Sequence, residues 1–285
     1  MTAGRTRSAA AEPFFLESGN GQRFCLFHHP AGPCRGAILY VHPFGEELNR
    51  SRRMAALQAR RLAALGYGVL QIDLYGCGDS AGDFADARWA LWLADLDAGA
   101  AWLREELGLP VILWGLRLGA TLALDYARTR PAAVAAMLLW QPVLNGATYL
   151  TQFLRLRMAN ALLTDNADAG GGGTGALRQQ LRDGATLEIG GYLLSPPLAA
   201  ALDALAPIEA LAPSCPVQWI EAIAAPGQAL PPGAARAIEK WQAIGVPLEV
   251  HGVHCPPFWT THEITVCQDW LDATASAMQA HRHAA

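Results

Sequence analysis

The most chemically informative residue of the chain is Arg117, at the centre of the run Gly115-Leu116-Arg117-Leu118-Gly119. An apolar run precedes this segment and small residues follow it, so the sequence predicts a strand, a sharp turn and a helix. The flanking glycines permit the turn, and the central side chain then projects from the end of the sheet. A serine there would attack a carbonyl carbon, whereas a guanidinium stays protonated and is no nucleophile. The sequence therefore predicts a turn of the kind that presents a catalytic nucleophile, with an arginine in the nucleophile's place.

Two further residues could complete a proton-transferring site with Arg117. His254 follows the strand expected over residues 247–251, and Glu221 ends the strand expected over residues 216–221. A histidine whose second nitrogen donates to a carboxylate is the usual pairing of a general base with its orienting acid. Glu221 is the only carboxylate near its strand end, where it either orients His254 or faces solvent. We take His254, Arg117 and Glu221 as the candidate catalytic residues.

The segment after the strand expected over residues 36–41 should form the wall opposite the turn. Backbone amides of this segment, and of the residue after the turn tip, supply the oxyanion hole in sites of this geometry. An enclosed guanidinium also needs acceptors, and Glu46 or Glu47 would serve Arg117. Carboxylates in this place would oppose a negative charge that develops on a substrate. We expect the oxyanion-hole and pocket residues to be His42, Phe44, Gly45, Glu46, Glu47 and Leu118.

The remaining polar motifs indicate structure more than chemistry. The loop from Asp73 to Gly82 has the pattern D-x-x-G-x-G-x-S-x-G, in which the Ser80 hydroxyl is expected to order the turn. Six cysteines occur without a C-x-x-C pair, so the sequence indicates neither a zinc site nor a disulfide framework, and we expect reduced thiols. Cys77 and Cys255 are alternative nucleophiles, although nothing in the sequence lowers a thiol pKa. We expect no metal and no cofactor.

Short apolar runs alternate with helix-length segments along most of the chain. This alternation predicts an α/β fold with a mostly parallel central sheet, helices on both faces and a ligand site at the carboxyl ends of the strands. The expected helices cover residues 49–65, 88–107, the stretch from the turn to 128, 233–244 and 262–280. The expected strands cover residues 24–28, 36–41, 68–72, 111–114, 135–140, 216–221 and 247–251.

The alternation is interrupted between residues 147 and 207. We expect residues 1–12 to be a flexible tail, residues 13–285 to form one domain, and residues 147–207 to be a helical cap inserted over the site. The four glycines at 170–173 hold regular structure only at an entropic cost, so they indicate a mobile loop. The cap side chains expected to line an enclosed pocket are Tyr149, Phe153 and Tyr192.

Composition indicates a globular protein with a large core. The 285 residues are 52% hydrophobic and carry a formal net charge of −4, which suits a single large α/β domain. The dense basic cluster Arg50, Arg52 and Arg53 indicates a solvated helix face, so we expect no nucleic-acid partner. Residues 1–13 lack the apolar core of a signal peptide, and no run reaches transmembrane length, so we expect a cytoplasmic protein without a membrane span.

Four segments together resemble a known family. Residues 42–53, 73–82, 114–117 and 257–264 are similar to those of the α/β-hydrolase fold family, and within it to hydrolases associated with bacterial exosortase and exopolysaccharide systems. The resemblance extends over nearly the whole chain beyond the N-terminal tail. It implies an α/β-hydrolase fold with a helical cap, and a cellular role beside exopolysaccharide-system proteins. It implies no particular substrate.

Two classes of function remain open at this point. In the first, the protein is a hydrolase or acyl-handling enzyme in which Arg117 binds an anionic group and His254 activates water. In the second, it is a catalytically inactive pseudo-hydrolase that binds a ligand or assembles with partners. Both classes imply a small-molecule ligand of acyl or glycan character, with exopolysaccharide-system proteins as possible partners.

Overall fold

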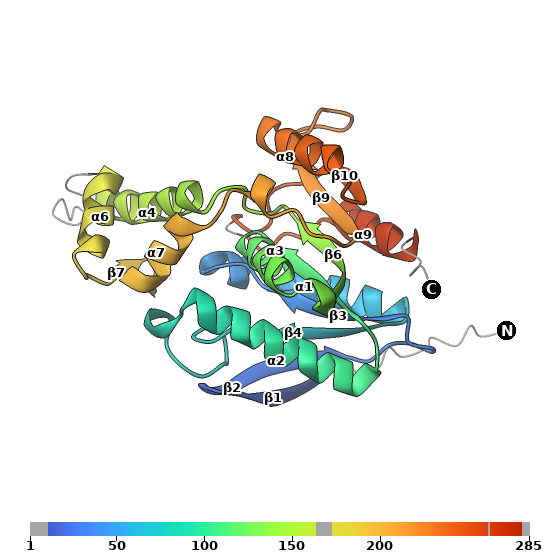
Figure 1. Cartoon of the computed structure of the whole chain (residues 1–285). Coiled ribbons are helices and arrows are strands. Elements are labelled where there is room, and N and C mark those ends of the chain that lie inside the picture. The colour runs from blue at the N-terminus through green and yellow to red at the C-terminus, as the bar shows by residue number, and fades with distance from the viewer. Residues whose placement is uncertain (1–10, 164–172, 262, 281–285) are drawn as a thin grey trace.

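A computed structural model describes residues 11–163, 173–261 and 263–280. Its central feature is an eight-stranded sheet in the order β1-β2-β4-β3-β5-β6-β9-β10 (Figure 1). The pairs β1/β2 and β2/β4 are antiparallel, and the other neighbours are parallel. The strands are β1 (Glu12–Ser18), β2 (Gly21–His28), β3 (Gly36–Val41), β4 (Tyr67–Ile72), β5 (Val111–Leu116), β6 (Val134–Trp140), β9 (Val217–Ile223) and β10 (Leu248–His254).

Helices cover both faces of this sheet. On one face of the sheet, the core contains an aromatic group that includes Trp114, Trp140 and Trp270, all without solvent exposure. The larger core cluster fills the opposite layer. One face carries α1 (Glu46–Ala64) and α9 (Gln268–Ala280), and the other carries α2 (Trp89–Leu107), α3 (Leu118–Thr129) and α8 (Pro232–Ala243). Short 3-10 turns are η1 (Phe84–Asp86), η2 (Pro131–Ala133) and η3 (Ile208–Ala210).

The mostly parallel sheet with helices on both faces is confirmed, and two element predictions are corrected. Strand β1 was not predicted, because its side chains do not alternate cleanly between apolar and polar. Phe14 packs on Trp102 with ring centroids 4.7 Å apart, while its neighbour Phe15 is exposed. The helix expected from residue 262 begins only at Gln268, and residues 263–267 before it are not helical.

The segment between β6 and β9 forms a separate group of elements beside the sheet, at the left of Figure 1. Its role as a cap remains a prediction. Residues 1–10 of the expected tail lie outside the described residues, as do residues 164–172 of the glycine-rich stretch, whereas Gly173 begins a helix. None of the described helices is long and apolar enough to cross a membrane. The elements are α4 (Gly146–Leu163), α6 (Gly173–Arg182), β7 (Leu187–Ile189), β8 (Tyr192–Leu194) and α7 (Pro196–Ala204).

The turn between β5 and α3 is packed tightly against the end of β3. A Cβ atom at Gly119 would overlap the carbonyl oxygens of Val41 and His42, and one at Gly115 would overlap the backbone of Ala120. Only glycine allows backbone segments to approach this closely. The two glycines therefore fix where the side chain at the tip of the turn meets the loop after β3.

Replacing Gly119 with alanine should lower the free energy of unfolding by about 1–3 kcal/mol, because the added methyl group overpacks a contact between backbone segments. Denaturant-induced unfolding measures this change. Gly175→Ala in α6 is the matched control, because a Cβ at Gly175 meets nothing within 4 Å. Equal stability of the two variants would contradict the close packing of the turn.

Candidate active site at the strand-to-helix turn

Arg117 stands at the tip of the turn, between the last residue of β5 and the first residue of α3. Its backbone has φ 56° and ψ −122°, a conformation that residues other than glycine rarely adopt. Such a conformation costs on the order of 1–3 kcal/mol and is held by surrounding bonds. The Arg117 amide donates to the carbonyl of Trp140 at 2.9 Å, and the Arg117 carbonyl accepts from the amide of Ala120 at 3.0 Å. The predicted turn is thus present, with the side chain of Arg117 at its apex.

The Arg117 guanidinium is enclosed and largely partnered. Its Nε donates to Oε1 of Glu47 at 3.3 Å, and Nη1 donates to the Gln141 carbonyl at 3.4 Å. The Cζ atom lies 5.8 Å from the ring centroid of Tyr149 and 5.4 Å from that of Trp259. Such stacking on aromatic faces stabilises a guanidinium. The expected ion pair with the acidic run after β3 is confirmed, and its partner is Glu47.

Glu47 links the turn to helix α4. Its second oxygen accepts a hydrogen bond from the Tyr149 hydroxyl at 3.1 Å. Burial raises the pKa of the Glu47 carboxyl above its ordinary value, while the charge of Arg117 lowers that pKa in part. Burial beside the same carboxylate raises the pKa of the Tyr149 hydroxyl well above its ordinary value. Tyr149 therefore stays protonated and serves Glu47 as a donor.

Glu46 faces a different set of partners. Its carboxylate lies 3.5 Å from Nε of Arg50, one turn along α1. It also accepts from the Tyr192 hydroxyl at 3.3 Å and from the Asn49 amide at 3.1 Å. The two adjacent glutamates thus hold two different segments: Glu47 binds α4, whereas Glu46 binds β8.

The predicted oxyanion-hole segment lies beside the turn. Gly45 has φ 56° and ψ −136°, which positions the loop just before α1 begins. Within the described part of the chain, the backbone amides of Phe44 and Leu118 donate to no carbonyl oxygen. Free amides beside the amino end of α3 can bind a negative charge. Their use as an oxyanion hole remains a prediction.

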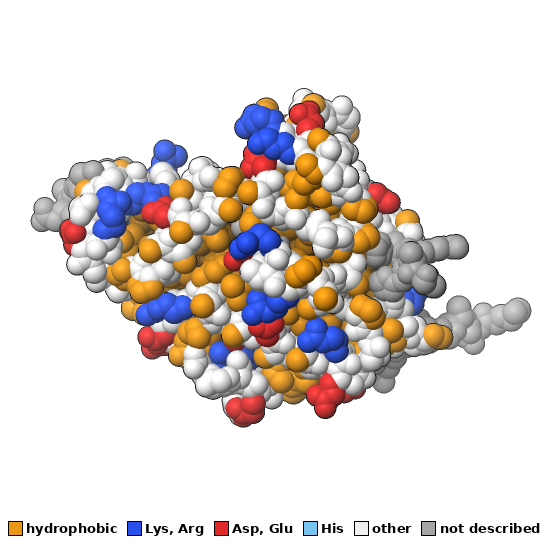
Figure 2. Space-filling model, viewed as in Figure 1, with side chains coloured by type: hydrophobic (Ala, Val, Ile, Leu, Met, Phe, Trp, Pro, Cys, Tyr) orange, Lys and Arg blue, Asp and Glu red, His pale blue; other side chains and the backbone are white. Residues whose placement is uncertain are grey.

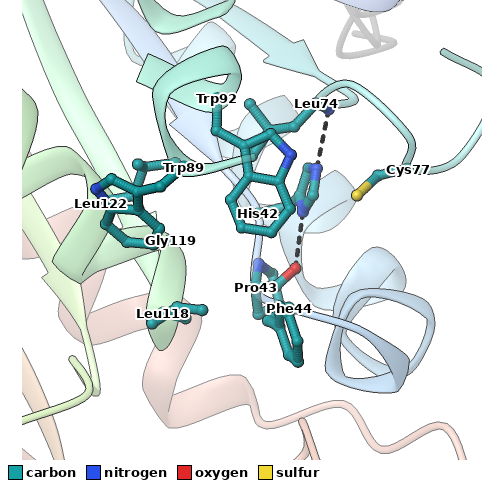
Figure 3. A pocket seen from close by; sticks show the side chains of 10 residues that line it. All are labelled: His42, Pro43, Phe44, Leu74, Cys77, Trp89, Trp92, Leu118, Gly119 and Leu122. Atoms are coloured by element: carbon teal, nitrogen blue, oxygen red, sulfur yellow. Dashed lines mark hydrogen bonds between the residues drawn. The ribbon is translucent and has the colours of Figure 1, made fainter. Parts of the chain in front are cut away.

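A small apolar cavity lies beneath this segment (Figure 3). Its volume is about 10 Å³, room for about one water molecule. The His42 ring in its wall has both nitrogens engaged: Nδ1 donates to the Pro43 carbonyl at 2.7 Å, and Nε2 accepts from the Leu74 amide at 3.0 Å. Burial lowers the pKa of His42. This histidine is therefore neutral and structural. The lining residues are His42, Pro43, Phe44, Leu74, Cys77, Trp89, Trp92, Leu118, Gly119 and Leu122.

The three aromatic residues predicted to line a cap pocket gather over the loop after β3. Ring centroids of Phe44 lie 4.8 Å from those of Phe153 and 5.9 Å from those of Tyr149. Tyr192 packs on Phe84 at 5.2 Å. Tyr149 and Phe153 thus pack on Phe44, Tyr192 packs on Phe84, and none of the three predicted residues lines the cavity of Figure 3. The enclosed ligand pocket expected among them remains a prediction.

The structure brings Glu221 toward Arg117 and gives it no bond to His254. Glu221 accepts from the Gln141 amide at 2.9 Å and from the Trp219 indole at 2.7 Å. His254 is exposed, and its Nδ1 lies 3.3 Å from the Ile223 carbonyl. Burial raises the pKa of Glu221 to about 7, while the Trp219 hydrogen bond, the charge of Arg117 and the Gln141 hydrogen bond lower it. The catalytic role of these residues remains a prediction.

The expectation that all cysteines are reduced is wrong for one pair. Cys255 and Cys267 are joined by a disulfide, with Cα atoms 6.1 Å apart. Cys255 follows β10 and Cys267 precedes α9, and their separation of 12 residues in the sequence does not reveal that the two side chains meet. Cys77 keeps a free thiol whose pKa is raised by burial, so it lacks the reactive thiolate form. Cys77 and Cys255, the two alternative nucleophiles, are therefore both unsuited to nucleophilic attack in this structure.

Two residues of the site were missed by sequence reasoning. Gln141 has φ 44°, and its backbone and side chain connect Arg117 with Glu221. Trp259 covers the guanidinium from the loop after β10. Gln141 directly follows β6, the strand beside β5, and this position at the end of a strand was the only feature of the sequence that could have marked it as a site residue. Among the described residues, no group of three or more His, Cys, Asp and Glu side chains is arranged to hold a metal ion.

Known proteins share this architecture. The family model for serine aminopeptidase, S33, matches residues 32–169. Est1E from Butyrivibrio proteoclasticus with bound ferulic acid is 15% identical, with a TM-score of 0.63 over 93% of this chain and 96% of that one. A thermostable carboxyl esterase from Bacillus coagulans, solved with glycerol, is 18% identical, with a TM-score of 0.63 over 95% and 97%.

A thioesterase domain from the curacin biosynthetic pathway is 18% identical, with a TM-score of 0.55 over 95% of this chain and 98% of that one. No curated protein sequence matches the chain. Together with the strand order and the turn, these similarities show that the chain has the α/β-hydrolase fold. Identities this low carry no activity from those proteins to this one.

Replacing Arg117 with serine should lower the free energy of unfolding by roughly 2–4 kcal/mol, because Glu47 then remains enclosed without its counter-charge. Adding Glu47→Gln should recover much of this loss. Urea unfolding of the single and double variants measures both changes. Arg128→Ser is the control on the same helix, since its ion pair with Asp125 is more exposed. A fully stable Arg117→Ser protein would contradict the importance of the ion pair.

Glu221 should make stability fall as the pH rises from about 4.5 to about 7. Its folded pKa of about 7 exceeds the ordinary value of 4.5, so the native state holds the proton more tightly than the unfolded state in this window. Glu221 contributes on the order of 2–4 kcal/mol to the free energy of unfolding below this pH range, and the contribution is lost above it. Unfolding measured from pH 4 to 8 should show this slope, and Glu221→Gln should lack it. Identical slopes would contradict the raised pKa.

Proposed function

We propose that this protein uses the α/β-hydrolase scaffold to bind a small anionic ligand of acyl or glycan character at Arg117, without an acyl-serine intermediate. The observation that carries this proposal is the fixed guanidinium at the apex of the turn. Nε and Nη1 are held by Glu47 and Gln141, while Nη2 donates to no acceptor in the part of the chain that the structure describes. A guanidinium with one free edge is well suited to a carboxylate or phosphate.

The surroundings of Arg117 favour an anion as well. The amides of Leu118 and Phe44 are free beside the amino end of α3, where the helix dipole attracts negative charge. Glu47 opposes an anion, but its charge is balanced by Arg117. The free amides and the helix dipole therefore supply the additional attraction for an anion that meets Nη2.

The same geometry argues against the acyl-serine route. The apex that would hold a nucleophilic hydroxyl holds a protonated group. Glu221, the acid expected to orient the base, is engaged by Gln141 and Trp219. These contacts support a pseudo-hydrolase that binds without acyl transfer.

Hydrolysis without a covalent intermediate is the second candidate. His254 Nδ1 lies 3.3 Å from the Ile223 carbonyl, and a proton donated there leaves Nε2 as the basic nitrogen. Such a nitrogen can take a proton from water while Arg117 holds the substrate anion. The esterase and thioesterase relatives of the fold support this alternative only as an analogy.

The sequence resemblance supplies the biological setting of the proposal. We place the protein in the cytoplasm of a bacterium with an exosortase and exopolysaccharide system, with proteins of that system as partners. The segment 147–207 would act as the cap of one domain spanning residues 13–285, with Tyr149, Phe153 and Tyr192 facing the ligand. Motifs 42–53 and 114–117 carry this resemblance.

The test compares matched pairs of acyl carboxylates and their primary amides by titration calorimetry. Each carboxylate should bind at least about tenfold more tightly than its amide, because a charge-assisted hydrogen bond to Arg117 is lost in the amide. Arg117→Met should remove this preference, Arg117→Lys should keep part of it, and Arg128→Met should leave it unchanged. Equal affinity for acid and amide would contradict the proposed anion site.

Activity assays separate the two candidates. A serine-directed fluorophosphonate probe should label neither the native protein nor Arg117→Ser, and the serine variant should remain a poor esterase, because Glu47 still opposes an oxyanion. Turnover of esters, thioesters or amides without labelling, abolished by His254→Ala, would establish the second candidate. Rapid ester hydrolysis and labelling by Arg117→Ser would show instead that the triad is intact apart from one residue.

A further inference from the structure

A second and larger cavity lies away from Arg117, between α1 and the strands β2, β3 and β4. Its volume is about 220 Å³, which suits a compact molecule of about a dozen non-hydrogen atoms. Small residues on α1, Ala55 and Ala56, leave the space over the sheet open. The lining residues are Phe24, Leu26, Tyr40, His42, Leu48, Arg52, Ala55, Ala56, Gln71, Ile72 and Asp73.

The polar groups of this cavity form a fixed set of donors and acceptors. Arg52 Nη2 donates to Oδ2 of Asp73 at 3.2 Å, and the Asp79 amide donates to the same oxygen at 3.1 Å. The Asp73 side chain is 9% exposed and the Arg52 side chain 43% exposed, so the pair extends from the interior to the mouth. Gln71 is held from below by His28, whose Nε2 lies 3.0 Å from Oε1 of Gln71.

The chain is built closely around this ion pair. Gly78 has φ 57°, and a Cβ at this position would overlap the Asp73 carboxylate and approach Arg52 Nη2 to 2.7 Å. The glycine-rich loop therefore presses directly on the pair and limits its movement. Burial lowers the pKa of His28, which keeps it neutral beneath Gln71. Donors and acceptors held in place in advance lose little freedom when a ligand binds.

The charges that line the cavity cancel. Arg52 and Asp73 supply one of each sign and are already paired, so an anion would meet Asp73 and a cation would meet Arg52. Within the described contacts, Oδ1 of Asp73 and the other guanidinium nitrogens of Arg52 have no protein partner. Unused donors lie beside unused acceptors, an arrangement that matches hydroxyl groups, which both donate and accept.

Apart from Tyr40, whose buried hydroxyl has no partner among the described residues, the remaining walls are apolar and suit a carbon frame. Phe24, Leu26, Leu48 and Ile72 present aromatic and aliphatic surface. His42 adds only ring carbons, because both its nitrogens are bonded to the backbone. We propose that this cavity is a binding site for a neutral polyhydroxylated molecule of monosaccharide size, held by Arg52, Asp73 and Gln71 and packed against Phe24.

The proposal is tested with the full-length protein and neutral sugars, namely glucose, galactose, mannose and myo-inositol, by saturation-transfer NMR and titration calorimetry. At least one neutral probe should bind with a millimolar dissociation constant. Arg52→Met should weaken that binding at least about tenfold, because hydrogen bonds to a charged group are lost. Ala56→Leu, which fills the cavity from the half-exposed side of α1, should abolish it.

Matched controls keep these results specific to the cavity. Arg53→Met and Ala64→Leu change exposed residues of the same helix that do not line the cavity, and both should bind as the unchanged protein does. Circular dichroism verifies that every variant is folded, and Gln71→Leu replaces Arg52→Met if the latter unfolds. Glucose 6-phosphate and glucosamine should bind more weakly than glucose, because neither charge has a free counter-charge.

Three outcomes would overturn the proposal. The first is the absence of millimolar binding by every neutral probe. The second is tighter binding of the phosphorylated or amino sugar, which would show a charged-ligand site. The third is binding that survives Ala56→Leu but is lost in Arg117→Met, which would place the sugar at the turn between β5 and α3.

Discussion

The enclosed ion pair between Arg117 and Glu47 is the interaction on which the rest of the site depends. Both side chains are about 85% shielded from solvent, so neither charge is stable there without the other. The pair joins three segments that are distant in sequence: the turn after β5, the start of α1 and, through Tyr149, helix α4. A left-handed backbone at Arg117 is tolerated because these contacts hold it.

This pairing also decides what chemistry the apex can support. A guanidinium that is fixed by Glu47 and Gln141 and covered by Tyr149 and Trp259 stays protonated and is no nucleophile, and its role as an anion receptor is a proposal. Glu221 approaches the same charge from behind Gln141, which helps to explain why its pKa lies below that of a wholly unpartnered buried acid. The apex of the turn is therefore part of a network of charges and hydrogen bonds that contains no hydroxyl nucleophile.

The sequence predicted those features that follow from local pattern and from topology. Alternating apolar runs gave the parallel sheet, and the paired glycines at 115 and 119 gave the turn with its arginine. A pair between Arg117 and either Glu46 or Glu47 was predictable because the ends of β3 and β5 are neighbours in the sheet, which brings their following loops together. The choice of Glu47 was not.

Other features depend on side-chain placement that no local pattern encodes. Tyr149 reaches Glu47 only because α4 returns over the turn, and Gln141 bridges two charges only because its backbone has a positive φ. Glu221, which either oriented His254 or faced solvent in the sequence analysis, is buried and accepts hydrogen bonds from Gln141 and Trp219 instead. Strand β1 escaped prediction because its outward face carries Phe15 rather than a polar side chain.

His42 lies between two cavities of the fold. Its ring forms part of the wall of the small cavity beneath the turn and part of the wall of the larger cavity beside α1. Because Pro43 and Leu74 hold both its nitrogens, the ring cannot turn without breaking two buried hydrogen bonds. A neutral histidine locked in this way is a rigid partition between the two cavities. The small cavity beneath the turn and the larger cavity beside α1 therefore keep separate shapes at this wall.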